Sequence, residues 1–214
     1  MYSSRSFRLI VGMSGATGQI YGIRLLEVLK NDPRVETHLI MSEWSEKTIG
    51  METDWHADDV RALADKNHDL EDLGATVSSG SFHRDAMVVI PCSIKSLSAI
   101  AYSLNSNLLV RAADVTLKER KPLILVARET PLHLGHLHTM VKVTNMGATL
   151  VPPVPAFYNH PMTLDDIVLQ TVNRVLDLVG LHKELAPRWS GDPADSIDQT
   201  AKQSQMEIGR VRRS

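Results

Sequence analysis

Short apolar runs alternate along the chain with segments in which apolar residues recur at helical spacing. The runs that predict strands lie near residues 8–13, 35–41, 86–90, 123–127 and 148–151, with a weaker one near 74–78. The helical patterns lie near residues 18–30, 42–50, 95–101, 108–120, 133–146 and 163–180. This alternation is typical of the α/β class. It predicts a mostly parallel sheet with helices on both faces, with ligands bound at the carboxyl ends of the strands.

The length of the chain favours one domain. With 214 residues and 43% hydrophobic content, it can bury one α/β core and is too short for two domains of ordinary size. The composition changes after Gly191, where the segment DPADSIDQTAKQSQMEIGRVRRS is polar with a basic end. We therefore expect a domain over residues 1–191 and a polar tail over 192–214, the tail being a surface helix or frayed end rather than a nucleic-acid-binding arm.

Charge and hydropathy exclude several classes of protein. A formal net charge of −2 provides no general attraction for nucleic acid or an anionic membrane surface. No apolar run has the length of a membrane span, and the N-terminal MYSSRSFR lacks the apolar segment of a signal peptide. The single cysteine, Cys92, cannot form an internal disulfide and fits a reducing compartment. These features predict a cytoplasmic protein.

Three glycines follow the first predicted strand, in the stretch LIVGMSGATGQIYGIRLLEVL. Gly12, Gly15 and Gly18 form the spacing G-x-x-G-x-x-G, which differs from the dinucleotide fingerprint G-x-G-x-x-G. A glycine-rich turn before a helix can direct backbone N–H groups at an anion, so the turn favours a phosphate-bearing ligand over a plain helix entry. NAD is disfavoured, because the second strand ends on Ser42 rather than on an acidic residue.

Polar residues also follow the other predicted strands. The segment PCSIKSLSAIA places Ser93, Lys95, Ser96 and Ser98 around the start of a helix. These hydroxyl groups could simply cap helices. Because such residues recur in adjacent loops, at Ser14–Thr17, at Ser42 and here, we favour a shared ligand.

Charged residues follow the strand near 123–127. Arg128 and Glu129 come directly after it, which suggests an anion-binding cation beside a general acid or base; the alternative is a solvated ion pair. Arg111 and Lys118 are seven residues apart and therefore share one helix face, which would be a phosphate clamp only if it lay near Arg128.

Two further candidates lie downstream. Tyr158 ends the proline-rich segment PPVPAFY, and Arg174 lies within an apolar helical pattern, where an arginine would need a partner. The histidines of HLGHLH lack the further ligands of a metal site, and Cys92 has no histidine placed to activate it. We therefore expect no metal site, and a packed, unreactive cysteine.

Several long motifs resemble the UbiX-type flavin prenyltransferases, a group that includes proteins long described as small subunits of hydroxyaromatic acid decarboxylases. The resemblance extends from residue 8 to about residue 191. It rests on GMSGATG, METD at 51–54, PCSIKSLSAIA, RAADVTLKERKPLILVARETPLHLGHL, PPVPAFY, QTVNRVLD and PRWSG.

The resemblance implies a Rossmann-like flavoprotein fold and a specific reaction. A dimethylallyl group would pass from dimethylallyl phosphate to reduced FMN, and the prenylated FMN would be handed to a UbiD-type decarboxylase. The family commonly forms homo-oligomers that are dodecamers. The residues that would hold the flavin are Gly15, Ala16, Thr17, Ser42, Ser93, Ile94, Lys95, Ser96 and Arg128.

The resemblance also assigns residues to the prenyl donor. Glu52 would lie near the reactive nitrogen of the flavin, Trp189 would wall the prenyl pocket, and Arg111 would arrive from a neighbouring subunit. Many members have serine where this chain has Thr17, a change that keeps the hydroxyl group. The residues that would meet the donor phosphate are Lys118, Arg128, Glu129, Tyr158 and Arg174.

The predicted reaction explains these residue types. Breaking an allylic carbon–oxygen bond leaves a delocalised cation and a phosphate, so the site needs fixed positive charge and exclusion of water. A monophosphate leaving group can be neutralised by arginine and lysine, so we expect no divalent metal.

Two other functions are considered. One is a flavin-dependent decarboxylase of the cysteine-decarboxylase type, which would carry a PASANT-like turn and an early catalytic histidine where this chain has PCSIKS and Trp44–Glu46. The other is a non-catalytic FMN-carrier subunit of a decarboxylase. A carrier would not need the cluster of charged residues around Arg128.

Overall fold

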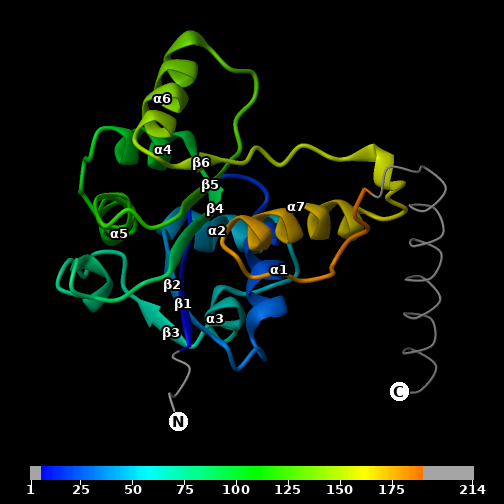
Figure 1. Ribbon diagram of the computed structural model, residues 1–214, viewed down its shortest axis with the longest axis horizontal. Coiled ribbons are helices and arrows are strands. Elements are labelled where there is room, and N and C mark those ends of the chain that lie inside the picture. Colours follow the sequence, from blue (N-terminus) through cyan, green and yellow to red (C-terminus); the bar gives the residue numbers. More distant parts are fainter. Residues whose placement is uncertain (1–5, 190–214) are drawn as a thin grey trace. The chain divides into compact units, whose positions relative to one another are not determined.

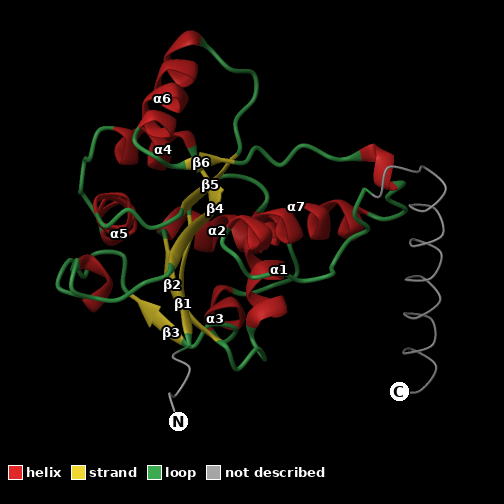
Figure 2. Ribbon diagram, viewed as in Figure 1, coloured by secondary structure: helices red, strands yellow, loops and turns green. Residues whose placement is uncertain are grey.

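The computed structural model describes residues 6–189 (Figure 1, Figure 2). The chain divides after Pro153 into two compact units, and each is considered by itself. The strands are β1 (Phe7–Met13), β2 (Val35–Met41), β3 (Lys66–His68), β4 (Ala86–Cys92), β5 (Leu123–Ala127) and β6 (Thr149–Leu150). The helices are α1 (Gln19–Leu29), α2 (Glu43–Glu52), α3 (Ala57–Arg61), α4 (Ile94–Ala101), α5 (Leu108–Lys118), α6 (Leu134–Asn145) and α7 (Leu164–Leu178), with short 3₁₀ turns at Thr76–Ser78 and Phe157–Asn159.

The first unit is built on a six-stranded sheet in the order β3-β2-β1-β4-β5-β6. Each neighbouring pair of strands is parallel, which confirms the α/β class and the parallel sheet. From β1 the sheet extends through β2 to β3 on one side. On the other side of β1 it extends through β4 and β5 to β6. The order of the strands therefore reverses between β1 and β4, the place at which ligands bind in open parallel sheets.

Helices cover both faces of this sheet, as the sequence predicts. Ile10 of β1 belongs to a buried cluster that includes residues of α4, α5 and α6. On the same face, a Cβ atom at Gly12 would lie 3.2 Å from the Leu109 side chain of α5. On the opposite face α1 packs closely, because a Cβ atom at Gly22 would lie 2.5 Å from the Ile90 carbonyl and 2.7 Å from the Met13 side chain.

The predicted weak strand near 74–78 is wrong. Residues Thr76–Ser78 form a 3₁₀ turn, and the third strand of the sheet is β3. Lys66 and Asn67 of β3 are exposed, so this edge strand has no apolar run that sequence periodicity could detect. It is held by parallel backbone pairing with His38–Ile40 of β2. The short helix α3 also had no predicted counterpart.

The second unit begins at Val154 and is described as far as Trp189. Helix α7 starts at a capping box in which Thr163 and Asp166 satisfy each other's backbone N–H groups. The segment after α7 is tied back by Arg188, which donates two hydrogen bonds to Asp177 at 2.7 and 2.8 Å and lowers the pKa of that carboxyl group. The predicted tail, 192–214, lies outside the described residues, so the predicted domain boundary at Gly191 stays a prediction.

Candidate active site

A cavity of about 540 Å³ lies at the carboxyl ends of β1, β2, β4 and β5, within the range of roughly 300–1,000 Å³ that is usual for small-molecule sites. All the residues predicted to hold a flavin line this cavity, and so does Glu129. They come from four loops that are far apart in the sequence and that the parallel sheet brings together. The cavity is also lined by residues that the sequence had not indicated: Glu43, Trp44, Leu70, Glu71 and Asn107.

Three helices in the described part of the first unit begin at this cavity. Ser42 caps α2 by accepting a hydrogen bond from the Ser45 N–H at 3.1 Å, and Ser93 caps α4 in the same way from Ser96 at 3.3 Å. Asn107 caps α5 by accepting from Val110 at 3.0 Å. The capping role considered for the serines is thus confirmed for Ser42 and Ser93. It is compatible with a ligand site, because three helix N-termini direct positive dipole ends toward one space.

Ser14 ties the two loops that meet where the strand order reverses. Its hydroxyl donates to the Pro91 carbonyl at 3.0 Å and accepts from the Ser93 N–H at 2.7 Å. The side chain is buried, with 1% of its surface exposed, so it acts inside the wall of the site. The ends of β1 and β4 are therefore held in fixed register.

Gln19 stabilises the glycine-rich turn through side-chain hydrogen bonds. Its Nε2 donates to the carbonyls of Ser14 at 2.9 Å and Ala16 at 2.8 Å, while its Oε1 accepts from the Ser45 hydroxyl at 2.7 Å. Gln19 is fully buried. One amide thus joins the turn after β1 to helix α2. The sequence contained no direct signal for this, since a glutamine at the start of a helix is usually exposed.

The N-terminus of α1 carries an anion supplied by the chain itself. The Glu52 carboxylate, at the end of α2, accepts from the Gly18 N–H at 2.8 Å and from the Gln19 N–H at 3.2 Å. The anion at these two backbone groups is therefore a carboxylate of the chain itself. Neither Gly18 nor Gln19 lines the cavity, so this does not test the prediction of a phosphate-bearing ligand. Glu52 lies beside the turn that holds Thr17, and its role toward the flavin stays a prediction.

Gly15 is required by its neighbour Trp44. A Cβ atom at Gly15 would lie 2.4 Å from the Cβ atom of Trp44, which is closer than two carbon atoms can approach. Trp44 is 61% exposed and lines the cavity. The glycine therefore allows an aromatic side chain to rest on the turn at the mouth of the site.

Arg128 and Glu129 follow β5 as predicted. The Arg128 N–H donates to the Cys92 carbonyl at 3.1 Å, so the backbone continues the pairing with β4 while the side chain is exposed. Glu129 is half-buried, and its Oε1 accepts from the Thr130 N–H at 3.1 Å. Among residues 6–189 no ion pair joins the two side chains, so a fixed Arg128–Glu129 pair is not formed here.

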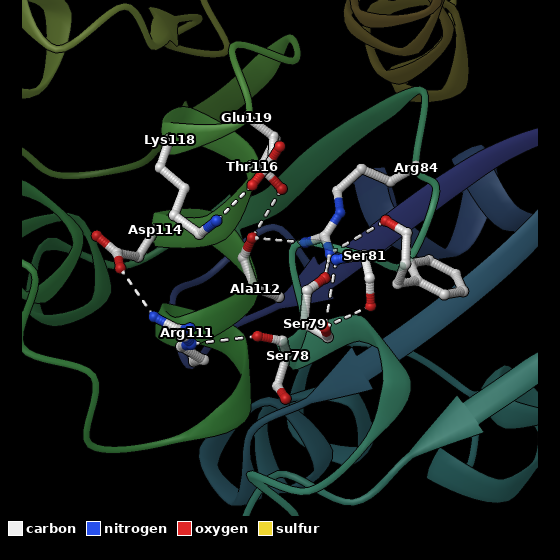
Figure 3. A network of polar contacts seen from close by, with 11 residues as sticks. Ser78, Ser79, Ser81, Arg84, Arg111, Ala112, Asp114, Thr116, Lys118 and Glu119 are labelled. Carbon is white, nitrogen blue, oxygen red and sulfur yellow. Dashed lines mark hydrogen bonds and ion pairs between the residues drawn. The ribbon is translucent and has the colours of Figure 1, made fainter.

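Arg111 and Lys118 share one face of α5, and both lie along the segment Ser78–Gly80 (Figure 3). Arg111 Nε donates to the Ser78 carbonyl at 3.2 Å, and Lys118 pairs with Glu119. Helix α5 begins at the cavity, and Lys118 is its last residue. Eleven residues at 1.5 Å each put Lys118 about 16 Å from that beginning, so one copy of the chain does not bring Lys118 to Arg128.

Tyr158, Arg174 and Trp189 belong to the second unit. The rings of Tyr158 and Trp189 meet edge to face, with centroids 5.7 Å apart, and both side chains are more than half exposed. Arg174 is exposed on α7 and does not lie within the apolar stripe, so the premise on which it was expected to need a partner is wrong.

The features that were set aside have structural roles. His133 caps α6 by accepting from the Gly135 N–H at 3.0 Å. Cys92 is fully buried, and burial raises the pKa of its thiol to about 12, which confirms a packed residue. Between residues 6 and 189, no three His, Cys, Asp or Glu side chains gather in a way that could hold a metal ion. No helix in that range is long and apolar enough to span a membrane.

Comparison with known proteins shows consistent similarity over most of the chain. The family model described as Flavoprotein matches residues 1–180. Flavin prenyltransferase UbiX of Escherichia coli strain K12 is 55% identical over 186 residues, which are 86% of this chain and 98% of that protein.

Two solved structures are similar in both sequence and fold. A crystal structure of AnUbiX in complex with FMN and dimethylallyl pyrophosphate is 50% identical, with a TM-score of 0.86, and covers 88% of this chain and 100% of its own. A structure from Escherichia coli O157:H7, described as a dodecameric FMN-dependent UbiX-like decarboxylase, is 53% identical with a TM-score of 0.84. It covers 86% of this chain and 100% of its own.

Proposed function

Because the chain belongs to the family of UbiX flavin prenyltransferases, we propose that it transfers a dimethylallyl group from an allylic phosphate to reduced FMN. One observation carries the proposal: every residue expected to hold the flavin lines a single cavity at the carboxyl ends of the strands. FMN supplies the reduced ring that accepts the prenyl group.

The residues of the cavity fit FMN. The N-termini of α2, α4 and α5 meet there and can stabilise a phosphate, and Ser93, Ser96 and Arg128 add hydroxyl and guanidinium donors. Trp44 and Ile94 supply apolar surface for a planar ring. The turn Gly15–Thr17, braced by Gln19, would meet the other side of the flavin.

In the proposed reaction the half-buried Glu129, which lines the cavity, would move a proton at the donor phosphate. A carboxylate beside a bound phosphate is repelled unless the two share a proton, which favours Glu129 as a general acid toward the departing phosphate. Arg128 would stabilise the negative charge that develops on the leaving oxygen. The aromatic rings of Tyr158 and Trp189 would exclude water and face the allylic cation.

Assembly completes the proposed site. Arg111 and Lys118 would reach the donor phosphate from a neighbouring copy, since α5 carries Lys118 away from Arg128 within one chain. The dodecamer described for the UbiX-like protein of Escherichia coli O157:H7 supports a homo-oligomer of the same size. A cytoplasmic location and a UbiD-type decarboxylase as recipient of the prenylated FMN complete the proposal.

The donor is proposed to be dimethylallyl monophosphate. The pyrophosphate present in the AnUbiX complex makes the diphosphate the comparison to test. Reduced FMN should be incubated anaerobically with the protein and each donor, and the flavin examined by mass spectrometry. The expected product is FMN enlarged by one dimethylallyl group, with faster formation from the monophosphate.

The same incubations test the other functions, and a further incubation with a peptide separates those functions from each other. A non-catalytic FMN carrier would return unmodified FMN from both incubations. A decarboxylase of the cysteine-decarboxylase type would also leave FMN unmodified, but would release carbon dioxide from a peptide with a C-terminal cysteine. Either result would overturn the proposed function.

A further inference from the structure

Arg84 is buried in the first unit, with 1% of its surface exposed, and it is the largest of the fully buried side chains described there. It precedes β4, in the turn that connects Ser79 to that strand. Buried charges are usually paired with an opposite charge. Among residues 6–189, no carboxylate lies within ion-pair distance of the Arg84 guanidinium.

The guanidinium instead contacts main-chain carbonyl groups (Figure 3). Nη2 donates to the carbonyl of Ser79 and, at 3.5 Å, to that of Phe82, while Nη1 donates to the carbonyl of Ala112 at 3.4 Å. Arg84 Nε is buried and has no hydrogen-bond partner. Ala112 lies on α5, so this one side chain fastens the segment after the 3₁₀ turn to the middle of that helix.

The fastened segment contacts two of the four cations predicted to bind the donor, Arg111 and Lys118. The carbonyl of Ser78, next to the one held by Arg84, accepts from Arg111 Nε at 3.2 Å. Gly80 lies against the other end of α5, where a Cβ atom would be 2.6 Å from Lys118 Nζ and 2.5 Å from Glu119 Oε1. The position of the segment therefore decides how Arg111 and the Lys118–Glu119 pair can be oriented.

Stability alone does not explain a buried arginine at this position. Burial lowers the pKa of Arg84, and the Glu119 carboxylate opposes this effect only in part. Replacing a buried charge with an apolar side chain of similar volume is often neutral or stabilising. The arginine fork, however, can hold several carbonyl groups in a fixed arrangement that an apolar side chain cannot reproduce.

We propose that Arg84 is a positioning residue for the donor phosphate: it fixes segment Ser78–Gly80 against α5, so that Arg111 and Lys118 are presented to the neighbouring copy in the orientation that binds the phosphate. The inference rests on the proposed function. It predicts that changing Arg84 weakens binding of the donor and leaves binding of FMN unchanged, because Arg84, Arg111 and Lys118 do not line the flavin cavity.

The test compares Arg84→Met with the wild-type enzyme in its assembled, FMN-loaded form. We expect KM for dimethylallyl phosphate to rise about tenfold, the effect of misplacing one hydrogen bond to a charged group, with kcat at saturating donor and Kd for FMN nearly unchanged. Calorimetric titration of dimethylallyl phosphate into protein loaded with oxidised FMN should show the same loss of affinity without turnover. Arg84→Lys, which keeps the charge and loses the fork, should be intermediate.

Arg34→Met is the control, because Arg34 is an exposed arginine that pairs with Asp32 just before β2 and has no hydrogen bond or ion pair with Arg84 or with the residues that Arg84 contacts. Unchanged donor KM in Arg84→Met would overturn the inference. So would parallel losses of FMN affinity, kcat and melting temperature, which indicate a purely structural role. If the wild-type enzyme forms no prenylated FMN, the proposed function fails, and donor calorimetry then decides separately whether Arg84 affects phosphate binding.

Discussion

At the level of single residues, Glu129 is the carboxylate whose surroundings best fit proton transfer. It follows a buried strand, is half-buried itself and lines the cavity beside Arg128. A positioned acid or base contributes typically about 10²–10⁴-fold in rate, so Glu129→Gln should lose about that factor in formation of prenylated FMN while retaining FMN. Steady-state kinetics at saturating donor provides the measurement. Full recovery of the rate at high donor concentration would instead mean that Glu129 only orients Arg128.

A second residue, His38, should make the stability of the first unit depend on pH. It is 4% exposed in β2, its Nδ1 lies 3.0 Å from His68 Nε2, and Glu36, Arg8 and Phe82 surround it. Burial, opposed in part by Glu36, lowers the pKa of His38 from 6.5 to about 4. Because the folded state binds this proton less readily than the unfolded state, stability is complete above pH 6.5 and falls as the pH drops toward 4.

The loss should reach up to about 3 kcal/mol, since one pKa unit corresponds to about 1.4 kcal/mol. Urea unfolding at pH 7.5, 6 and 5 measures how the free energy of unfolding changes over this range. His38→Phe should flatten the pH dependence, and His138→Gln, at an exposed position, should not. An equally steep dependence in His38→Phe would assign the effect to other groups.

Residues at the strand ends could be predicted because the fold requires no polar groups there, so Ser42, Ser93 and Arg128 stood out against apolar runs. The structural roles of Ser14, Gln19 and Asn107 could not be predicted. These roles depend on which loops become neighbours in the folded chain. The copy of the chain whose donor site Lys118 would serve could not be assigned for a related reason: helical spacing fixes the helix face on which a residue lies, but not the end of the sheet that this face reaches.

At the level of secondary structure elements, the turn between β1 and α1 depends on the amide of Gln19. Gln19→Met removes the hydrogen bonds to Ser14 and Ala16 with little change in volume, leaving those carbonyl groups free to turn. We expect Kd for FMN to rise about tenfold, since one or two hydrogen bonds of roughly 1 kcal/mol are lost. Titration of the protein with FMN, followed by flavin fluorescence, measures this Kd.

Ser45→Ala is the control for this variant. It removes the bond from Ser45 to Gln19 Oε1 and keeps both bonds to the turn, so FMN affinity should change less. Equal effects in the two variants would show that α2, and not the turn, determines flavin binding.

Most strands of the sheet could be predicted from the sequence, and β3 could not. Strands β4 and β5 are buried throughout and wholly apolar, and β1 and β2 each end in an apolar, buried run, so all four are visible in the sequence. Strand β3 has three residues and lies at the edge of the sheet. It is held by backbone hydrogen bonds, which do not require particular side chains and therefore give no signal in the sequence.

At the level of the whole molecule, an active site shared between copies can be tested by complementation. Lys118→Ala and Glu129→Gln should each be nearly inactive, but co-expressed chains should regain activity, because some sites combine the intact Lys118 of one copy with the intact Glu129 of another. Random assembly of equal amounts would leave about a quarter of the sites intact. Activity no higher than that of the separate variants would place Lys118 outside its neighbour's site.

Prenyl transfer is also expected to proceed without a divalent metal. Arg128, together with Arg111 and Lys118 of a neighbouring copy, would provide the positive charge that stabilises a departing monophosphate. Activity should therefore survive EDTA with no further gain from magnesium. Loss of activity in EDTA that magnesium restores would contradict this.

The position of Glu52 has a consequence for the ligands expected at this sheet edge. In dinucleotide-binding sheets the pyrophosphate binds at the N-terminus of the first helix. Here the Glu52 carboxylate already accepts from Gly18 and Gln19 at 2.8 and 3.2 Å. A group tethered to the same chain competes at an effective concentration of roughly millimolar or above, so a free dinucleotide would have to displace a competitor that never diffuses away. We therefore expect dinucleotides to bind weakly at this sheet edge, and the phosphate of a mononucleotide to bind instead at the helices that begin at Ser42, Ser93 and Asn107.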